Sequence, residues 1–225
     1  MFDPKKLLDD LLGSKVPGTD STLRDKAGQA TQLAKDNPLA TGALVAGLAY
    51  KAYQNYRAGE APGSGGATAE PELLPPPSDS EFRPETAPQG ETEFALTLVR
   101  AMIAAARADG HIDDEERGKI ADRLTLSGIG AEAESFLVSE LERPVDVDAL
   151  VAEARTEAQR VELFTASRLA IEPQTRAERG YLDMLAGRLK LPDALVDHIE
   201  ATVSSAKEPV PAQPAPGDAP AGRSP

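Results

Sequence analysis

The sequence contains no cysteine and no tryptophan, and only two of its 225 residues are histidine. The lack of cysteine excludes disulfides, thiolate metal sites and cysteine nucleophiles. Because His111 and His198 stand in separate segments, a zinc site of the ordinary type is not expected. The chain also lacks a glycine-rich phosphate loop, a nucleophile elbow and a metalloprotease motif. These absences predict a protein that is not an enzyme.

Basic residues are scarce as well: 24 lysines and arginines stand against 37 acidic residues, which gives a formal net charge of −13. A surface of this sign does not suit a phosphate backbone, so no nucleic-acid partner is expected. The first residues do not form a cleavable signal peptide, because Asp9 and Asp10 interrupt a short apolar stretch. The sequence therefore predicts that the globular part of the chain lies on the cytoplasmic side.

Proline and glycine divide the chain into segments. Residues 58–90 are rich in glycine, serine and proline and have few apolar anchors, so they cannot bury enough surface to offset their ordering entropy. The tail at 207–225 has the same composition. We predict an N-terminal helical segment at 1–57, a disordered linker at 58–90, a globular domain at 91–206 and a disordered tail at 207–225.

Apolar residues recur with helical periodicity throughout 91–206, and no window shows the sustained alternation of a strand. The pattern predicts an all-α bundle of about seven helices joined by short loops, preceded by short N-terminal helices. The expected helices of the bundle are about 91–108, 114–126, 131–142, a short one capped by Asp146, 156–170, one starting at Thr175 and one starting at Pro192. Glu178 completes a capping box with Thr175.

The segment at 38–57 has two interpretations. Its uncharged run, Pro38–Tyr50, spans roughly 20 Å as a helix, against about 30 Å of membrane hydrocarbon, which favours a buried or oligomerising soluble helix. The tyrosines and basic residues that follow the run are typical of a membrane interface. Small residues four apart, such as Gly42 and Ala46, would let another helix approach closely in either case. The sequence leaves both interpretations open.

Acidic residues gather at a turn, with five carboxylates between Asp109 and Glu116. Most of them have a structural role, since Asp113 and Glu116 form a capping-box pattern and Gly110 suits the end of a helix. Asp109 is the exception, because a carboxylate at the carboxyl end of a helix is disfavoured by the helix dipole. Clustered carboxylates are the ligands that hard divalent cations prefer. The turn is therefore a candidate cation site, with capping and solvation as the alternative.

The residues LVRAMIAAARADGHID at 98–113 resemble the opening helix and acidic turn of TerB-like domains, which are named for tellurite-resistance proteins. The later LAIEP at 169–173, followed by Thr175, Glu178 and Tyr-Leu at 181–182, strengthens this resemblance. The whole plan is similar to YebE-type inner-membrane proteins, a family of unassigned function. The resemblance implies an all-helical bundle with no established catalysis. It also implies divalent-cation binding through acidic turn residues, and an association with stress complexes at the membrane.

Carried over by position, the resemblance implies that Asp109 and Glu116 ligate a cation, with Glu172 and Glu178 as second-repeat candidates. The ion would be calcium, magnesium or manganese. We therefore expect a non-enzymatic, membrane-associated module that binds a divalent cation or docks a protein, located at the inner membrane. Self-association through the apolar helix is a further expectation. The alternative is a soluble cytoplasmic interaction protein with no metal site.

Overall fold

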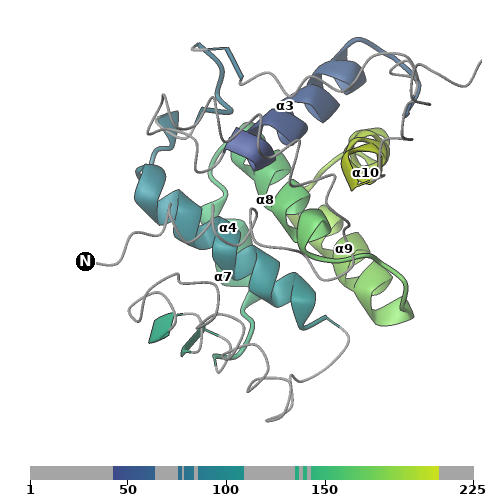
Figure 1. Ribbon diagram of the computed structural model, residues 1–225. Coiled ribbons are helices and arrows are strands. Elements are labelled where there is room, and N and C mark those ends of the chain that lie inside the picture. The colour runs from purple at the N-terminus through teal and green to yellow at the C-terminus, as the bar shows by residue number, and fades with distance from the viewer. Residues whose placement is uncertain are drawn as a thin grey trace, which may run out of the picture.

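The computed structural model describes residues 43–63, 76–77, 79–83, 86–108, 135–136, 139–140 and 143–207. These residues form six helices and no strand, which confirms the all-α class (Figure 1). The helices are α3 (Ala43–Arg57), α4 (Glu91–Ala106), α7 (Val147–Glu153), α8 (Glu157–Ala170), α9 (Arg176–Leu189) and α10 (Asp193–Lys207). The expected helix at 114–126 lies outside the described residues, and most of the one at 131–142 does too.

Local sequence signals set the helix starts. The Asp146 side chain accepts a hydrogen bond from the Ala149 backbone N–H at 2.9 Å and caps α7, as predicted. The predicted capping box at the start of α9 is present, with Thr175 and Glu178 bonded reciprocally. A second capping box, between Thr156 and Gln159, starts α8. These caps satisfy backbone N–H groups that a helix leaves without intrahelical partners.

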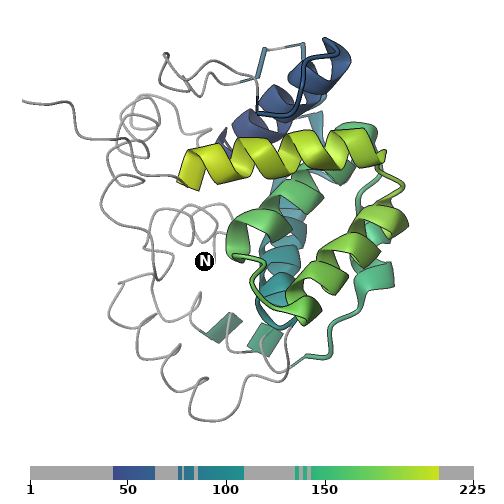
Figure 2. The same cartoon turned by 90° about the vertical axis from the view of Figure 1, so that its right-hand side faces the viewer.

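Helix α8 is the centre of the fold, in contact with α3, α4, α9 and α10. Figure 2 shows α10 crossing over α8 beside α3. Apolar residues lie all around α8, and every residue from Ala158 to Leu169 is buried except Arg160. Hydroxyl groups inside this core bond to the helix itself, as Thr165 does to the Val161 carbonyl at 2.8 Å. A helix that is surrounded on all sides has to satisfy its own polar groups in this way.

Helix α3 belongs to the same core. Val45, Leu48, Ala49 and Ala52 are 0–2% exposed, and the helix contacts both α8 and α10. The predicted close approach through small residues four apart stays a prediction, because Gly42 lies outside the described residues. Among the described residues, no helix is long and apolar enough to cross a membrane. Of the two interpretations of the apolar segment, the structure thus shows the buried helix, packed within this chain.

Part of the segment between α3 and α4 also packs against the bundle. The Phe82 side chain is 5% exposed, and its ring centroid lies 5.6 Å from that of Tyr50 and 5.3 Å from that of Tyr53. The Ser80 hydroxyl accepts a hydrogen bond from the Phe82 backbone N–H at 3.1 Å. The predicted linker at 58–90 therefore contains an aromatic anchor, and the described part of it is packed at that anchor on α3. The other predicted boundaries stay predictions.

Candidate functional site

Two of the four predicted cation ligands, Asp109 and Glu116, lie outside the described residues. The other two have structural partners. Glu172 Oε1 lies 2.8 Å from Lys207 Nζ, and Glu178 Oε2 accepts hydrogen bonds from the backbone N–H groups of Thr175 and Gln174. Bonds from Thr175 and Gln174 hold the pKa of the Glu178 carboxyl below its usual value.

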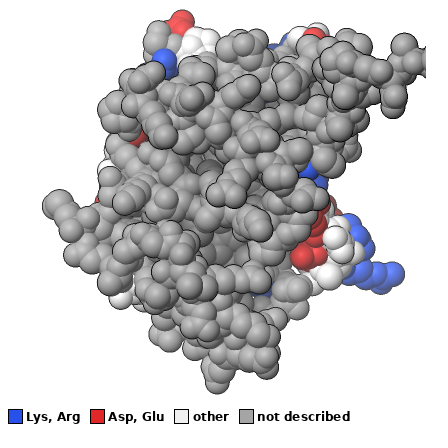
Figure 3. Space-filling model, viewed as in Figure 1, with Lys and Arg blue, Asp and Glu red and all other residues white. Residues whose placement is uncertain are grey.

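The described residues contain no group of three or more acidic or histidine side chains placed to hold a metal ion. Figure 3 shows acidic and basic side chains next to one another at the right-hand edge of the face, near the position of α9 in Figure 1. In the part that it describes, the structure thus places neither Glu172 nor Glu178 in a group of metal ligands. Their assignment as cation ligands stays a prediction.

A buried arginine joins the end of α8 to α10. The Arg168 side chain is 5% exposed, and its Nε lies 2.5 Å from Glu200 Oε2. Its other nitrogens donate to the Ile171 carbonyl at 2.9 Å and to Ser204 Oγ at 3.2 Å. Lys207 Nζ donates to the same Ile171 carbonyl at 3.0 Å. Cationic groups at the carboxyl end of a helix satisfy carbonyls that have no intrahelical partner. The network is therefore structural, and Glu172 belongs to it through Lys207.

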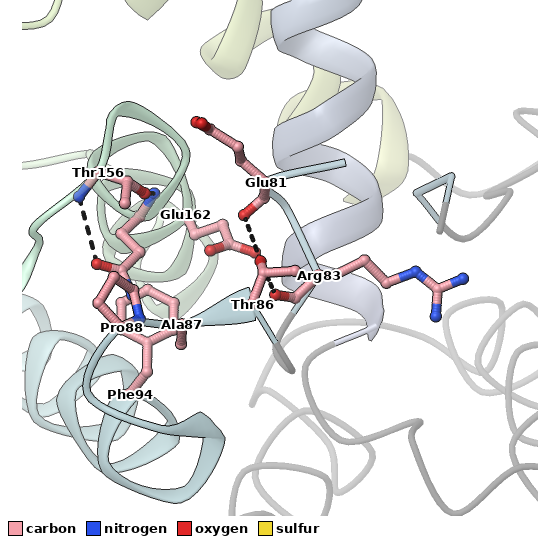
Figure 4. A pocket seen from close by; sticks show the side chains of 9 residues that line it. Glu81, Arg83, Thr86, Ala87, Pro88, Phe94, Thr156 and Glu162 are labelled. Carbon is pink, nitrogen blue, oxygen red and sulfur yellow. Dashed lines mark hydrogen bonds between the residues drawn. The ribbon is translucent and has the colours of Figure 1, made fainter. Parts of the chain in front are cut away.

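A cavity of about 260 Å³ opens between the segment before α4 and the first turns of α8 (Figure 4). Its lining residues are Glu81, Arg83, Thr86, Ala87, Pro88, Phe94, Thr156, Gln159 and Glu162. The Thr86 hydroxyl donates to the carbonyls of Arg83 and Glu81, at 2.7 and 3.3 Å. The Gln159 amide donates to Gln89 at 3.1 Å and accepts from the Arg155 backbone at 2.8 Å. The neutral polar side chains of the wall are thus held by the protein itself.

Glu162 differs from these residues. It is 4% exposed, and no hydrogen bond or ion pair to its carboxyl group is formed within the described part of the chain. Figure 4 shows its side chain extending from α8 toward Thr86 on the opposite wall. Burial raises the pKa of this carboxyl group well above its usual value, because the charged form is poorly solvated there. A buried acid without a partner in a cavity is a candidate functional group, because buried polar groups are usually paired.

A family model described as "Protein of unknown function (DUF533)" matches residues 11–203 of the chain. The chain belongs to the DUF533 family. The match includes α3 and the segment that carries Phe82 as well as the later helices, in agreement with their shared core.

The DUF533 chain is also similar to a protein of Yersinia enterocolitica named "Uncharacterized protein in ampR 5'region". The two are 31% identical over 111 residues, which are 49% of this chain and 80% of the relative. No solved structure matches the chain significantly. The comparisons therefore assign a family, and the family carries no assigned activity.

Sequence reasoning on this DUF533 chain did not single out Glu162, although a signal was present. Val161, Leu163, Phe164, Ala166 and Leu169 spread over more than one face of the helix, which is typical of a helix buried all around. In such a helix a carboxylate is poorly exposed to solvent on every face. The apolar pattern on both sides of Glu162 is thus in itself a signal of a buried acid.

We expect the Glu162→Gln variant to be more stable than the parent at about pH 8, by about 1–3 kcal/mol. The pKa of Glu162 is raised in the folded state, so the folded state binds more protons than the unfolded state between the two pKa values. Stability of the parent therefore falls as pH rises through this interval, and glutamine removes the loss. Urea unfolding of both proteins from about pH 4 to pH 8 measures the difference, which should disappear at the acidic end.

Glu157→Gln is the matched control, because Glu157 is exposed and lies on the same helix. This variant loses a favourable charge in the first turn of α8, so it should be less stable by a few tenths of a kcal/mol at about pH 8. A gain for Glu162→Gln that is the same at every pH would show that the carboxyl group does not hold its proton.

Proposed function

We propose that this DUF533 protein is a non-enzymatic, TerB-like binding module whose acid-rich turn at 109–116 binds a divalent cation. The end of α4 is the observation that supports the proposal. The helix ends at Ala106, and the Ala108 backbone N–H donates to the Ala105 carbonyl at 3.0 Å. Asp109 therefore follows directly after the negative end of a helix dipole, where a bound cation would stabilise its carboxylate.

The described residues change the expected composition of this site. Glu172 and Glu178 are occupied by Lys207 and by the cap of α9. We therefore propose that Asp109 and Glu116 supply the ligands without the two second-repeat carboxylates. The alternative is a structural interaction protein with no metal site. The structural partners of the two carboxylates, Lys207 for Glu172 and the cap of α9 for Glu178, favour this alternative.

The cation proposal predicts that Asp109→Ala weakens binding of Mg²⁺, Ca²⁺ or Mn²⁺ by about tenfold or more, because one of few oxygen ligands is lost. Titration of each chloride salt, followed by the amide chemical shifts of residues 109–116, measures the affinity. Glu172→Ala is the matched control and should leave the affinity unchanged, since Glu172 is paired with Lys207. Amide shifts that do not move with any of the three ions would support the interaction protein instead.

The finer assignment to YebE-type inner-membrane proteins is supported by the order of an apolar segment followed by a helical domain. Within this proposal, membrane association does not use the buried face of α3, because α8 and α10 cover that face. Self-association through the apolar helix would likewise need a different face of it. Separation of membrane and soluble fractions of cells that express the full chain tests the location.

A further inference from the structure

The cavity beside α8 presents hydrogen-bond acceptors and little positive charge. The Thr86 hydroxyl has backbone carbonyls within donating distance, so it is free to accept a hydrogen bond from a guest through its lone pairs. Arg83 Nε donates to the Pro77 carbonyl at 3.4 Å, and Figure 4 shows its guanidinium group extending away from Glu162 and Phe94. A guest that donates hydrogen bonds or carries positive charge therefore suits the cavity.

We propose that this cavity binds a small organic cation of the primary-amine class, with its ammonium group against the Glu162 carboxylate. Glu162 is the buried acid of the wall, 4% exposed, and it has no partner among the described residues. Without a guest, the cavity holds this acid in its protonated form, so binding of the ammonium group would release the proton to the solvent. The ammonium group would then supply both the counter-charge and the hydrogen bonds that the ionised carboxylate lacks. This inference concerns a different site from the acid-rich turn and does not depend on it.

The walls select an organic cation over a metal ion. Ala87, Pro88 and Phe94 form an apolar part of the lining, which suits a short hydrocarbon chain. The Phe94 ring also offers an aromatic surface, and such surfaces attract cations. A divalent metal ion would need several converging oxygen ligands, and the described residues hold no such group of acids here. A volume of about 260 Å³ limits the guest to a small molecule.

The probe is n-butylammonium chloride, titrated into the full chain at about pH 8 and constant ionic strength and followed by amide chemical shifts, because the raised pKa of Glu162 makes its ionised form accessible only toward alkaline pH. We expect saturable shifts at Thr86, Phe94, Gln159 and Glu162. Glu162→Gln keeps the shape of the side chain and removes its charge, so it should weaken binding by at least about tenfold. The control Glu157→Gln should bind as the parent does. The neutral analogue n-butanol should bind the parent at least about tenfold more weakly than the amine does.

Several results would overturn the proposal. They are an absence of saturable shifts with n-butylammonium, equal binding of n-butanol, and undiminished binding to Glu162→Gln. A further titration with magnesium chloride identifies a metal site: shifts of the cavity amides with Mg²⁺ and not with the amine would replace the organic cation by a metal ion. Urea unfolding of Glu162→Gln shows that the variant is folded, so a loss of binding can be assigned to the lost charge.

Discussion

Leu48→Ala lowers the free energy of unfolding of the whole bundle by about 2–5 kcal/mol, the usual cost of truncating a buried leucine. Leu48 is 2% exposed on α3, which contacts α8 and α10. The variant would leave a cavity between helices that are distant in sequence, so the loss should appear in the single cooperative transition of the helical fold. Urea unfolding followed by the helical circular dichroism signal measures it.

The control for this prediction is Gln54→Ala. Gln54 is exposed on the same helix, and its side chain donates to the Tyr50 hydroxyl at 2.6 Å. An exposed substitution of this kind should change stability by no more than about 0.5 kcal/mol. If Leu48→Ala were equally mild, α3 would not contribute to the stability of the core.

Arg168→Ala should be the second large effect, with a loss of about 3 kcal/mol. Removing one partner of a buried ion pair leaves the other charge without compensation, at a typical cost of about 3–5 kcal/mol. We expect a loss at the lower end of this range, because the Glu200 side chain is 34% exposed and keeps some contact with water. The variant also removes donors to the Ile171 carbonyl and to Ser204. Urea unfolding at neutral pH measures the loss.

The chain contains a matched pair for comparison. Arg188 forms an ion pair with Asp148, but the two side chains are 46% and 78% exposed. Arg188→Ala should therefore cost at most about 1 kcal/mol, since exposed ion pairs are weakened by solvent. Equal losses for the two arginine variants would mean that burial does not determine the contribution of Arg168, and the network at the end of α8 would lose its structural role.

The helices could be predicted from the sequence because their signals are local. The periodicity from Glu91 onward and the caps at Asp146 and Thr175 each depend on residues only a few positions apart. The packing of α3 could not be predicted in this way, because it depends on which distant helices cover its apolar face. Phe82 shows the same limit, since a single aromatic residue in a proline-rich segment gives no period.

The candidate site shows how local physics and family resemblance can differ. The spacing of Thr175 and Glu178 predicted a capping box, and the structure confirms that box. The resemblance assigned Glu178 to a cation site as well, and that assignment stays a prediction, while the structure shows its carboxylate bonded to the start of α9. The apolar pattern around Glu162 signals a buried acid, but the cavity that it faces depends on the packing of a distant segment, which the sequence pattern does not give.

The first and last described helices, α3 and α10, lie against each other. A ribosome adds roughly 5–20 residues per second, so α3 waits on the order of ten seconds before α10 has been made. During this time, among the described helices, α8 is the one that can cover α3, and the part of α3 that α10 will contact stays uncovered by it. A chain truncated before α10 would therefore expose part of the apolar face of α3 and would be prone to aggregate. Addition of α10 covers that face.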